Sequence, residues 1–203
     1  GLTGKTLGSL GVGNIGGEMF RLLAPFDFGR RIACDPYTSP ERAAALGVEL
    51  VDLETLFRES DFLTVNCPLT AETQGIVNAE RLALMKPTAY LINTARGPIV
   101  NQADLTAALQ AGQIAGAGLD VFEEEPLDVN HPLIRMDNVI LSPHALAWTD
   151  ELYELNGVLA CENALAVLRG DLPRWPVNRD VLARPGFQAK LARLRQRWEQ
   201  LES

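Results

Sequence analysis

A glycine-rich stretch near the start of the chain constrains its fold more than any other feature. The apolar segment Thr6–Leu10 leads into Gly11-x-Gly13-x-x-Gly16, and apolar residues at helical spacing follow. In such a unit the first glycine permits a tight turn, the second lets backbone amides approach a pyrophosphate, and the third lets the helix pack closely. Unpaired amides and the positive end of the helix dipole then favour an anion at this turn.

An acidic residue strengthens this interpretation, because a glycine motif alone joins strands to helices in many proteins. The apolar run Arg31–Cys34 ends at Asp35, which follows Gly16 at about the 20-residue spacing of a ribose-binding acid. A carboxylate there accepts hydrogen bonds from the adenosine ribose and repels a 2′-phosphate. The sequence therefore predicts a dinucleotide site that prefers NAD to NADP.

Short apolar runs alternate with helical patterns through the first part of the chain. Further strands are expected at Val48–Val51, Phe62–Asn66, Ala89–Asn93, Ile114–Asp120 and Val139–Leu141, and helix starts at Ser39, Asp52, Thr70, Asn78 and Asn101. Asn101 with Asp104 three residues later resembles a capping arrangement for the helix that reaches Leu109. The alternation predicts an α/β fold, a doubly wound parallel sheet of Rossmann type, with ligands beyond the carboxyl ends of the strands.

The rest of the chain is expected to form a separate segment. A helical pattern runs from Thr149 to Leu168, Gly170–Pro173 interrupts it, and a charged amphipathic stretch follows from Arg184 to Glu202. We expect residues 1–147 to form the nucleotide-binding domain and residues 148–203 to form a returning helix with a C-terminal segment.

Composition narrows the possible partners. The 203 residues carry a formal net charge of −8 and are 47% hydrophobic, which suits a globular chain with a substantial core. Negative charge argues against a nucleic-acid surface, and no run approaches about 18 consecutive apolar residues, so no membrane span is expected. Three widely spaced cysteines suggest neither disulfides nor a zinc site. We therefore expect no bound metal and a cytoplasmic location.

Three further residues could carry chemistry. The guanidinium of Arg96 matches a carboxylate bidentately and can help polarise a neighbouring keto group. His144 can exchange a proton with a hydroxyl or carbonyl oxygen, and a carboxylate such as Glu125 favours the protonated imidazole. Each also has a structural alternative, namely a surface ion pair for Arg96, a loop cap for His144 and a solvated acidic turn for Glu125.

The ordered motifs resemble the D-isomer-specific 2-hydroxyacid dehydrogenases. The resemblance covers residues 1–144 and rests on Gly11–Gly16, Asp35, Cys67–Thr70, Asn93–Gly97, Leu119–Val121 and Pro143–His144. It implies a Rossmann-type fold, NAD as the cofactor, and hydride transfer between NAD(H) and a small 2-hydroxy or 2-keto acid. It also implies a homodimer through the nucleotide-binding lobe, with Asp120–Pro132 as an exposed arm.

The resemblance further implies roles for individual residues. Arg96 would bind the substrate carboxylate, His144 would be the acid and base, and Glu125 would pair with His144. Contacts with NAD are implied for Gly11, Gly13, Asn14, Ile15, Gly16, Asp35, Cys67, Pro68, Thr94, Ala95, Arg96, Asp120, His144 and Ala147. Asp120 would lie near the nicotinamide carboxamide.

Two departures from the family pattern change these expectations. Ala145–Trp148 replaces the usual glycine-rich turn, so side chains are expected to narrow the pocket beside the nicotinamide. Family members also carry a substrate-binding lobe ahead of the nucleotide lobe, and this chain opens almost directly on the glycine motif. We therefore expect the cofactor-binding part of an enzyme, inactive alone, whose C-terminal segment would pack on the substrate lobe.

Two other functions stay open at the level of sequence. A nucleotide-sensing interaction module, like the dehydrogenase-related transcriptional corepressors, would keep similar residues because a fold does not determine a function. A member acting on formate or phosphite is the second alternative. Glu125 argues against formate, because that branch characteristically has an amide at this position.

Overall fold

A computed structural model describes the chain from Gly1 to Glu202. The described residues form two compact units, Gly1–Leu146 and a second unit that begins at Ala147. None of the helices between Gly1 and Glu202 combines the length and the apolar character needed to cross a membrane.

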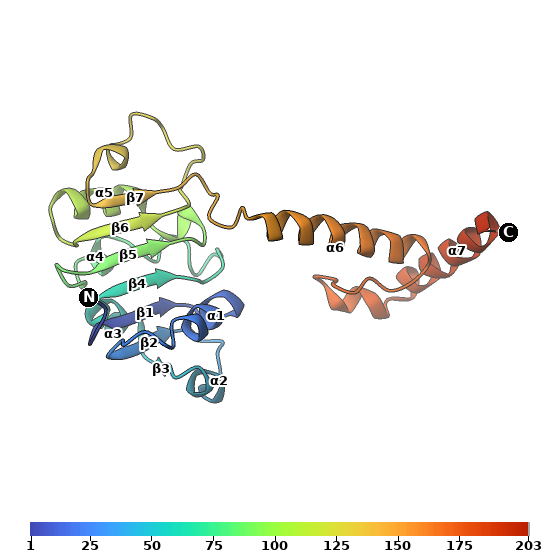
Figure 1. Cartoon of the computed structure of the whole chain (residues 1–203), viewed down its shortest axis with the longest axis horizontal. Helices are drawn as coiled ribbons and strands as arrows, with labels where there is room; N and C mark the ends of the chain where they lie inside the picture. Colours follow the sequence, from blue (N-terminus) through green and yellow to red (C-terminus); the bar gives the residue numbers. More distant parts are fainter. Residues whose placement is uncertain (203) are drawn as a thin grey trace. The chain divides into compact units, whose positions relative to one another are not determined.

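Within the described residues of the first unit, seven parallel strands form one sheet in the order β3-β2-β1-β4-β5-β6-β7 (Figure 1). The strands are β1 Thr6–Leu10, β2 Arg30–Cys34, β3 Glu49–Leu50, β4 Phe62–Val65, β5 Tyr90–Asn93, β6 Gly116–Leu119 and β7 Val139–Leu141. The order reverses between β1 and β4, which is the switch point where doubly wound sheets bind ligands. The predicted fold class is therefore confirmed.

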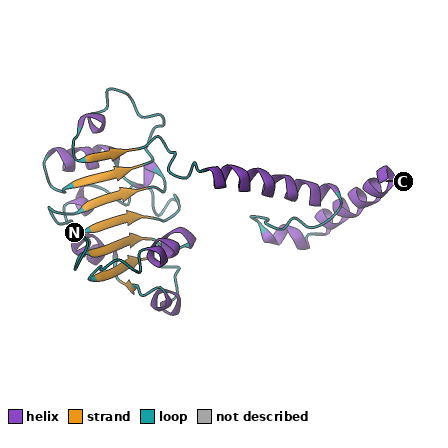
Figure 2. Cartoon of the chain, viewed as in Figure 1, coloured by secondary structure: helices purple, strands orange, loops and turns teal. Residues whose placement is uncertain are grey.

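Helices flank the sheet on both faces (Figure 2). They are α1 Asn14–Leu22 and α2 Pro40–Ala45 on one face, and α3 Leu53–Glu59, α4 Ala79–Leu82 and α5 Gln102–Gln110 on the other, with 3-10 turns η1 Gly97–Ile99 and η2 Pro132–Arg135. Four expected caps are confirmed, because the side chains of Ser39, Asp52, Asn78 and Asn101 each accept a backbone N–H from the helix that follows. These caps satisfy amides that the first helical turn leaves unpaired.

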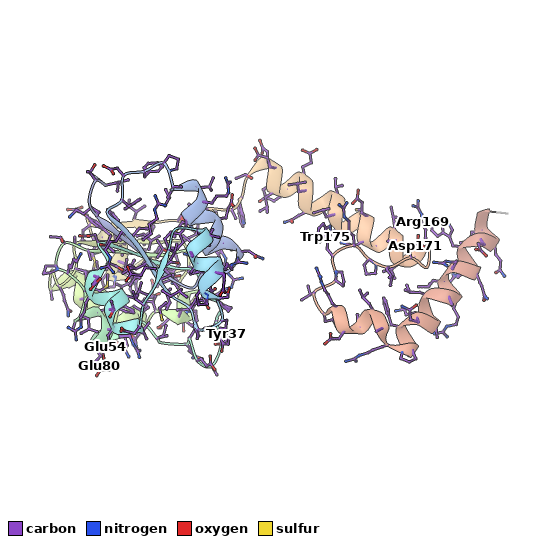
Figure 3. All side chains as sticks on the ribbon, turned by 90° about the horizontal axis from the view of Figure 1, so that it is seen from below. Tyr37, Glu54, Glu80, Arg169, Asp171 and Trp175 are labelled. Carbon is purple, nitrogen blue, oxygen red and sulfur yellow. The ribbon has the colours of Figure 1, made fainter. Side chains whose placement is uncertain are left out.

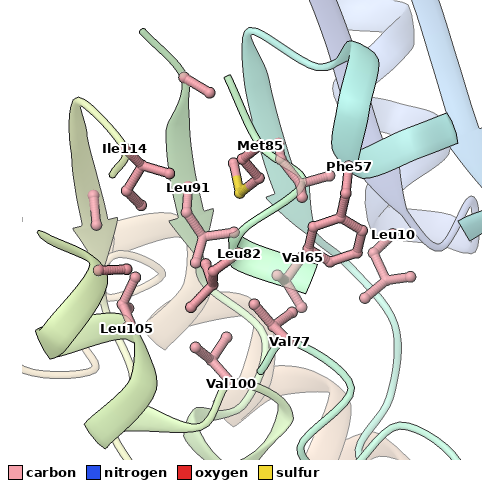
Figure 4. Close-up of a cluster of buried hydrophobic side chains, with 14 of the residues drawn as sticks. Leu10, Phe57, Val65, Val77, Leu82, Met85, Leu91, Val100, Leu105 and Ile114 are labelled. Carbon is pink, nitrogen blue, oxygen red and sulfur yellow. The ribbon is translucent and has the colours of Figure 1, made fainter. Parts of the chain in front are cut away.

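Apolar side chains from each face of the sheet pack beneath the helices. The larger cluster, drawn in Figure 4, joins Phe57 of α3, Leu82 of α4 and Leu105 of α5 to the strands. On the other face Phe20 of α1 packs with Leu7, Val12, Ala33 and Val48. Fully burying a side chain as large as Phe57 contributes about 1.5–3 kcal/mol, so these clusters hold the strand ends in place.

One local expectation was wrong. Residues 71–75 after Thr70 form a turn rather than a helix, and the Thr73 hydroxyl there donates to the Pro68 carbonyl over 2.6 Å. The bond from this hydroxyl to the backbone of Pro68 competes with the local helical pattern. The Asn101 cap is present as expected, and the carboxylate of Asp104 accepts in addition the N–H of Ala79, at the start of α4, over 2.9 Å.

The second unit consists of α6 Asp150–Leu168, η3 Arg179–Ala183 and α7 Pro185–Glu202. Figure 3 shows Trp175 beside α6, and Arg169 and Asp171 at its carboxyl end. The amide oxygen of Asn163 accepts the N–H of Arg174 over 2.9 Å, which ties the following segment to α6. No residue of α6, all of which is described, is buried.

Candidate functional site

The glycine turn follows β1 at the carboxyl edge of the sheet. Gly11 has a φ of 98°, and a Cβ there would lie 2.9 Å from the backbone nitrogen of Cys67. A Cβ on Gly16 would lie 2.5 Å from the carbonyl oxygen of Gly11, so the third glycine brings α1 close to the turn. A Cβ on Gly13 would meet nothing within 4 Å. The backbone at Gly13 therefore borders open space, which fits the pyrophosphate of the expected dinucleotide.

The Asp35 carboxylate lies beside this turn. It accepts the N–H of Val12 over 2.7 Å, the N–H of Tyr37 over 2.9 Å and the hydroxyl of Thr38 over 3.1 Å. Burial alone would raise the pKa of Asp35, but these hydrogen bonds together lower it. Asp35 is thus held ionised and fixed in orientation, as an acceptor of ribose hydroxyls must be.

A cavity of about 950 Å³ opens at the switch point, and we call it the switch-point cavity. Its walls include Gly11, Gly13, Cys34, Asp35, Cys67 and Pro68. Burial raises the pKa of Cys67 to about 11 and also raises the pKa of Cys34, so both thiols are uncharged near neutral pH. The cavity therefore combines mainly uncharged walls with the carboxylates of Asp35 and Glu72, and Asp35 lies beside the glycine turn, an arrangement that suits an adenosine.

Arg96 stands on a turn that Asn93 shapes. The buried amide of Asn93 accepts the N–H of Ala95 over 3.1 Å and donates to the carbonyl of Arg96 over 3.0 Å. The Arg96 side chain is exposed and donates to the Ala95 carbonyl over 2.5 Å, and no carboxylate among residues 1–201 pairs with it. Its remaining donors are available for a carboxylate ligand, and the structure does not show the surface ion pair that was the alternative.

Gly97 brings the end of β5 against the segment after β6. A Cβ on Gly97 would lie 1.8 Å from the carbonyl oxygen of Phe122 and 1.9 Å from its carbon. These are backbone atoms, which cannot rotate away, so the site has no room for a side chain. No pattern in the sequence predicted this contact, and its one signal was the glycine directly after Arg96.

His144 and Glu125 meet beyond β6 and β7. Nδ1 of His144 lies 2.7 Å from Oε2 of Glu125, and Oε1 of Glu125 accepts the N–H of Phe122 over 3.0 Å. The hydrogen bond from His144, followed by that from Phe122, lowers the pKa of Glu125. His144 also has a φ of 55°, a left-handed conformation that is uncommon for a residue with a side chain and often marks a functional position. A cavity of about 530 Å³ adjoins this pair.

Asp120 holds the loop that carries His144. This carboxylate is 4% exposed and accepts the hydroxyl of Ser142 over 2.5 Å, the N–H of Ala145 over 2.9 Å and that of Leu146 over 3.3 Å. This function of Asp120 was not predicted from the sequence, because the donors lie more than twenty positions further along the chain. The expected contact of Asp120 with the nicotinamide stays a prediction.

The remaining predicted residues are placed as follows. Asn14, Ile15 and Thr94 are exposed at strand or helix ends beside the glycine turn or β5, and Ala95 is partly exposed. Ala147 belongs to the second unit, so its contact with the cofactor stays a prediction. Among residues 1–202, no group of three or more His, Cys, Asp or Glu side chains is arranged to hold a metal ion.

Comparison with known proteins identifies a matching family. The model for "D-isomer specific 2-hydroxyacid dehydrogenase, NAD binding domain" matches residues 1–145. These residues include the glycine turn, Asp35, Arg96, Glu125 and His144.

Individual relatives extend the match. A glyoxylate reductase of Thermofilum pendens is 45% identical over 196 residues, which are 94% of this chain and 56% of that protein. The crystal structure of the TT0316 protein from Thermus thermophilus superimposes with a TM-score of 0.81 at 39% identity, over 87% of this chain and 54% of that one. An NAD-complexed D-isomer specific 2-hydroxyacid dehydrogenase from Lactobacillus delbrueckii gives a TM-score of 0.76 at 30% identity, over 86% and 56%. The chain thus spans about half the length of the curated relatives it matches.

Proposed function

The chain belongs to the D-isomer specific 2-hydroxyacid dehydrogenase family through its NAD-binding domain, and from this premise we propose that it is the cofactor-binding part of an NAD-dependent oxidoreductase. The reaction is hydride transfer between NAD(H) and a small 2-hydroxy or 2-keto acid. The observation that carries the proposal is the 2.7 Å contact between His144 and Glu125 at the sheet edge that also bears the glycine turn. Relatives with dehydrogenase and reductase names do not favour the corepressor alternative.

The residues around the switch-point cavity fit NAD. Gly11, Gly13 and Gly16, with the amides of Asn14 and Ile15, would hold the pyrophosphate at the start of α1. Asp35 would accept hydrogen bonds from the ribose, and Cys67 and Pro68 would line the space beside it. Bound NAD(H) supplies or accepts the hydride.

The contact between His144 and Glu125 indicates which imidazole nitrogen would exchange a proton with the substrate. Glu125 occupies Nδ1 of the imidazole, which leaves Nε2 to face the substrate oxygen. Nε2 would donate a proton to the keto oxygen during reduction and take it from the hydroxyl during oxidation. The ionised Glu125 holds the Nδ1 proton and orients the ring, while Asp120 fixes the loop beneath it.

Arg96 would orient the substrate. Its guanidinium can bind the substrate carboxylate with two parallel hydrogen bonds, which aligns the neighbouring keto carbon. Asn93 supports this function by holding the backbone on both sides of Ala95. The glyoxylate reductase relatives make glyoxylate the first keto acid to assay.

Two measurements test the proposal. Calorimetry on the chain should detect NADH, and Gly13→Val should abolish binding by filling the open space at the turn. In a protein that joins this chain to a substrate-binding lobe, glyoxylate should drive NADH oxidation, followed by absorbance. Absence of NADH binding overturns the cofactor assignment, whereas binding without turnover on any 2-keto acid overturns the enzymatic one.

We also propose that the first unit pairs with a second copy of itself. β7 is an edge strand and its Ile140 is 79% exposed, and Ile134 and Val129 of the preceding segment are exposed as well. Unpaired strand edges with apolar side chains favour association. Light scattering over a concentration series should give a dimer mass, and a monomer at every concentration would contradict this.

The second unit is proposed to pack on a substrate-binding lobe. The support is α6, which carries exposed apolar residues such as Tyr153, Leu155 and Val158 and buries none of them. Large apolar side chains that stay exposed on a long helix usually mark a surface that another part of the protein covers. Protection of α6 from hydrogen exchange in the longer protein tests this proposal.

We also propose that the protein is cytoplasmic, because its three cysteines are free thiols. Cell fractionation tests this location.

A further inference from the structure

A second hollow lies between α1 and α2, beside the glycine turn. It has a volume of about 350 Å³ and is lined by Asn14, Gly17, Glu18, Arg42, Ala45 and Leu46. Gly13 lines the switch-point cavity and the next residue, Asn14, lines this hollow. The two spaces therefore adjoin along the backbone of the glycine turn.

Arg42 brings a positive charge to this hollow. It projects from α2, and its Nη2 donates to the carbonyl oxygen of Gly13 over 3.2 Å. That bond uses one of five guanidinium N–H donors, and no carboxylate among residues 1–201 forms a salt bridge with Arg42. The carboxylate of Glu18 is already held by Arg21 over 2.8 Å and 2.5 Å. The unneutralised charge in the hollow is thus that of Arg42.

Neither the pyrophosphate nor the ribose of NAD requires Arg42, because the glycine turn and Asp35 serve those groups. A guanidinium beside a side-chain amide, next to a helix N-terminus, is a donor set suited to an additional phosphate. The dinucleotide that carries an additional phosphate at this end is NADP, on its adenosine ribose.

We propose that Arg42 and Asn14 form a latent subsite for the 2′-phosphate of NADP(H), which the Asp35 carboxylate keeps unused in the native chain. The inference rests on the proposed dinucleotide site. Gly13 lines the cavity that would hold a ribose bonded to Asp35, and Gly13 also accepts a hydrogen bond from Arg42, so a phosphate on the 2′-oxygen would approach both Asp35 and Arg42. Repulsion by the fixed carboxylate opposes the attraction of the guanidinium.

Calorimetry with 5′-ADP and 2′,5′-ADP on the full chain tests this without any turnover. The native chain should favour 5′-ADP. Asp35→Asn keeps an acceptor for the Val12 N–H and should increase the affinity for 2′,5′-ADP at least tenfold. In the Asp35→Asn variant, the further change Arg42→Met should lower the affinity for 2′,5′-ADP at least tenfold. The same change should alter the affinity for 5′-ADP less than threefold. Adding Arg58→Met instead removes the same charge from α3, where Arg58 pairs with Glu54 outside the hollow, and should change neither ligand more than threefold.

Each outcome decides between two accounts. If Arg42→Met lowers the affinity for 5′-ADP and for 2′,5′-ADP equally, Arg42 only supports the glycine turn. If it changes neither affinity, Arg42 contacts no phosphate. Either result overturns the inference. If NADH and 5′-ADP bind and only the variants fail, the proposed function stands. If the native chain binds neither, the dinucleotide site itself is wrong and the inference falls with it.

Discussion

Oε2 of Glu125 lies 2.7 Å from Nδ1 of His144, although the two residues follow different strands of the sheet. The other oxygen of Glu125 is held by the N–H of Phe122. This geometry makes Glu125 a fixed anion behind the imidazole rather than a solvated member of an acidic turn.

The ionisation of Glu125 should respond to His144. His144→Ala removes the largest cause of its lowered pKa, so the pKa of Glu125 should rise towards its ordinary value, with the Phe122 bond retaining part of the shift. Carbon NMR titration of the side-chain carboxyl measures this. His131→Ala is the matched control, and an unchanged Glu125 pKa in His144→Ala would contradict the hydrogen bond.

Catalysis should depend on His144 much more than cofactor binding does. In a protein that contains a substrate lobe, His144→Ala should lower kcat by about 10²–10⁴ and leave NAD affinity within about threefold. Steady-state kinetics with saturating 2-keto acid measure kcat, and near-normal turnover of His144→Ala would refute the acid/base assignment.

Arg96→Lys should instead reduce kcat and raise KM together, because an ammonium cannot reproduce the bidentate fork of the guanidinium. Steady-state kinetics over a range of 2-keto acid concentrations measure both parameters.

Gly97 should tolerate no side chain. Its Cβ would overlap the Phe122 carbonyl, and Gly97→Ala should lower the free energy of unfolding by about 2–3 kcal/mol, the upper part of the range for overpacked sites. Gly17→Ala is the matched control, since that Cβ comes no nearer than 3.4 Å to any atom and lies within α1. Urea unfolding measures both variants, and equal stabilities would disprove the clash.

Asp61 should make stability depend on acid pH. Burial would raise its pKa, but the N–H of Thr6, Lys86 and Lys5 together lower it. A lowered folded pKa stabilises the protein above the unfolded value of about 3.9, and this stabilisation disappears as pH falls through the folded pKa. Asp61→Asn should cost about 1–3 kcal/mol at pH 7 and progressively less below pH 4. A cost that is independent of pH would contradict this, with the exposed Asp137→Asn as control.

Cys67 should react slowly with alkylating reagents. With a pKa of about 11, its thiolate fraction at pH 8 is about 10⁻³, and labelling should accelerate about tenfold per pH unit up to pH 10. The exposed Cys161 should be labelled first. Peptide mass spectrometry after iodoacetamide gives the order, and equal rates for Cys67 and Cys161 at pH 8 would show that the switch-point cavity does not bury the thiol.

Features that depend on neighbours within a few residues could be predicted from the sequence alone. The glycine turn, the alternation of strands and helices, and the caps at Ser39, Asp52 and Asn78 were identified, because φ preference, side-chain periodicity and capping act within one helical turn. Resemblance then singled out Arg96, Glu125 and His144, and the pairing of the last two is present in the structure.

Only the tertiary structure determined which of these local units contact one another, and through which side chains. The parallel sheet brings residues far apart in the chain to one edge, where Asp120 holds the loop before Leu146, Gly97 admits the Phe122 carbonyl and Arg42 reaches Gly13. Even Asp104 caps α4 rather than its own helix. Such contacts depend on close packing and on satisfying buried polar groups between distant segments, so no local pattern records them.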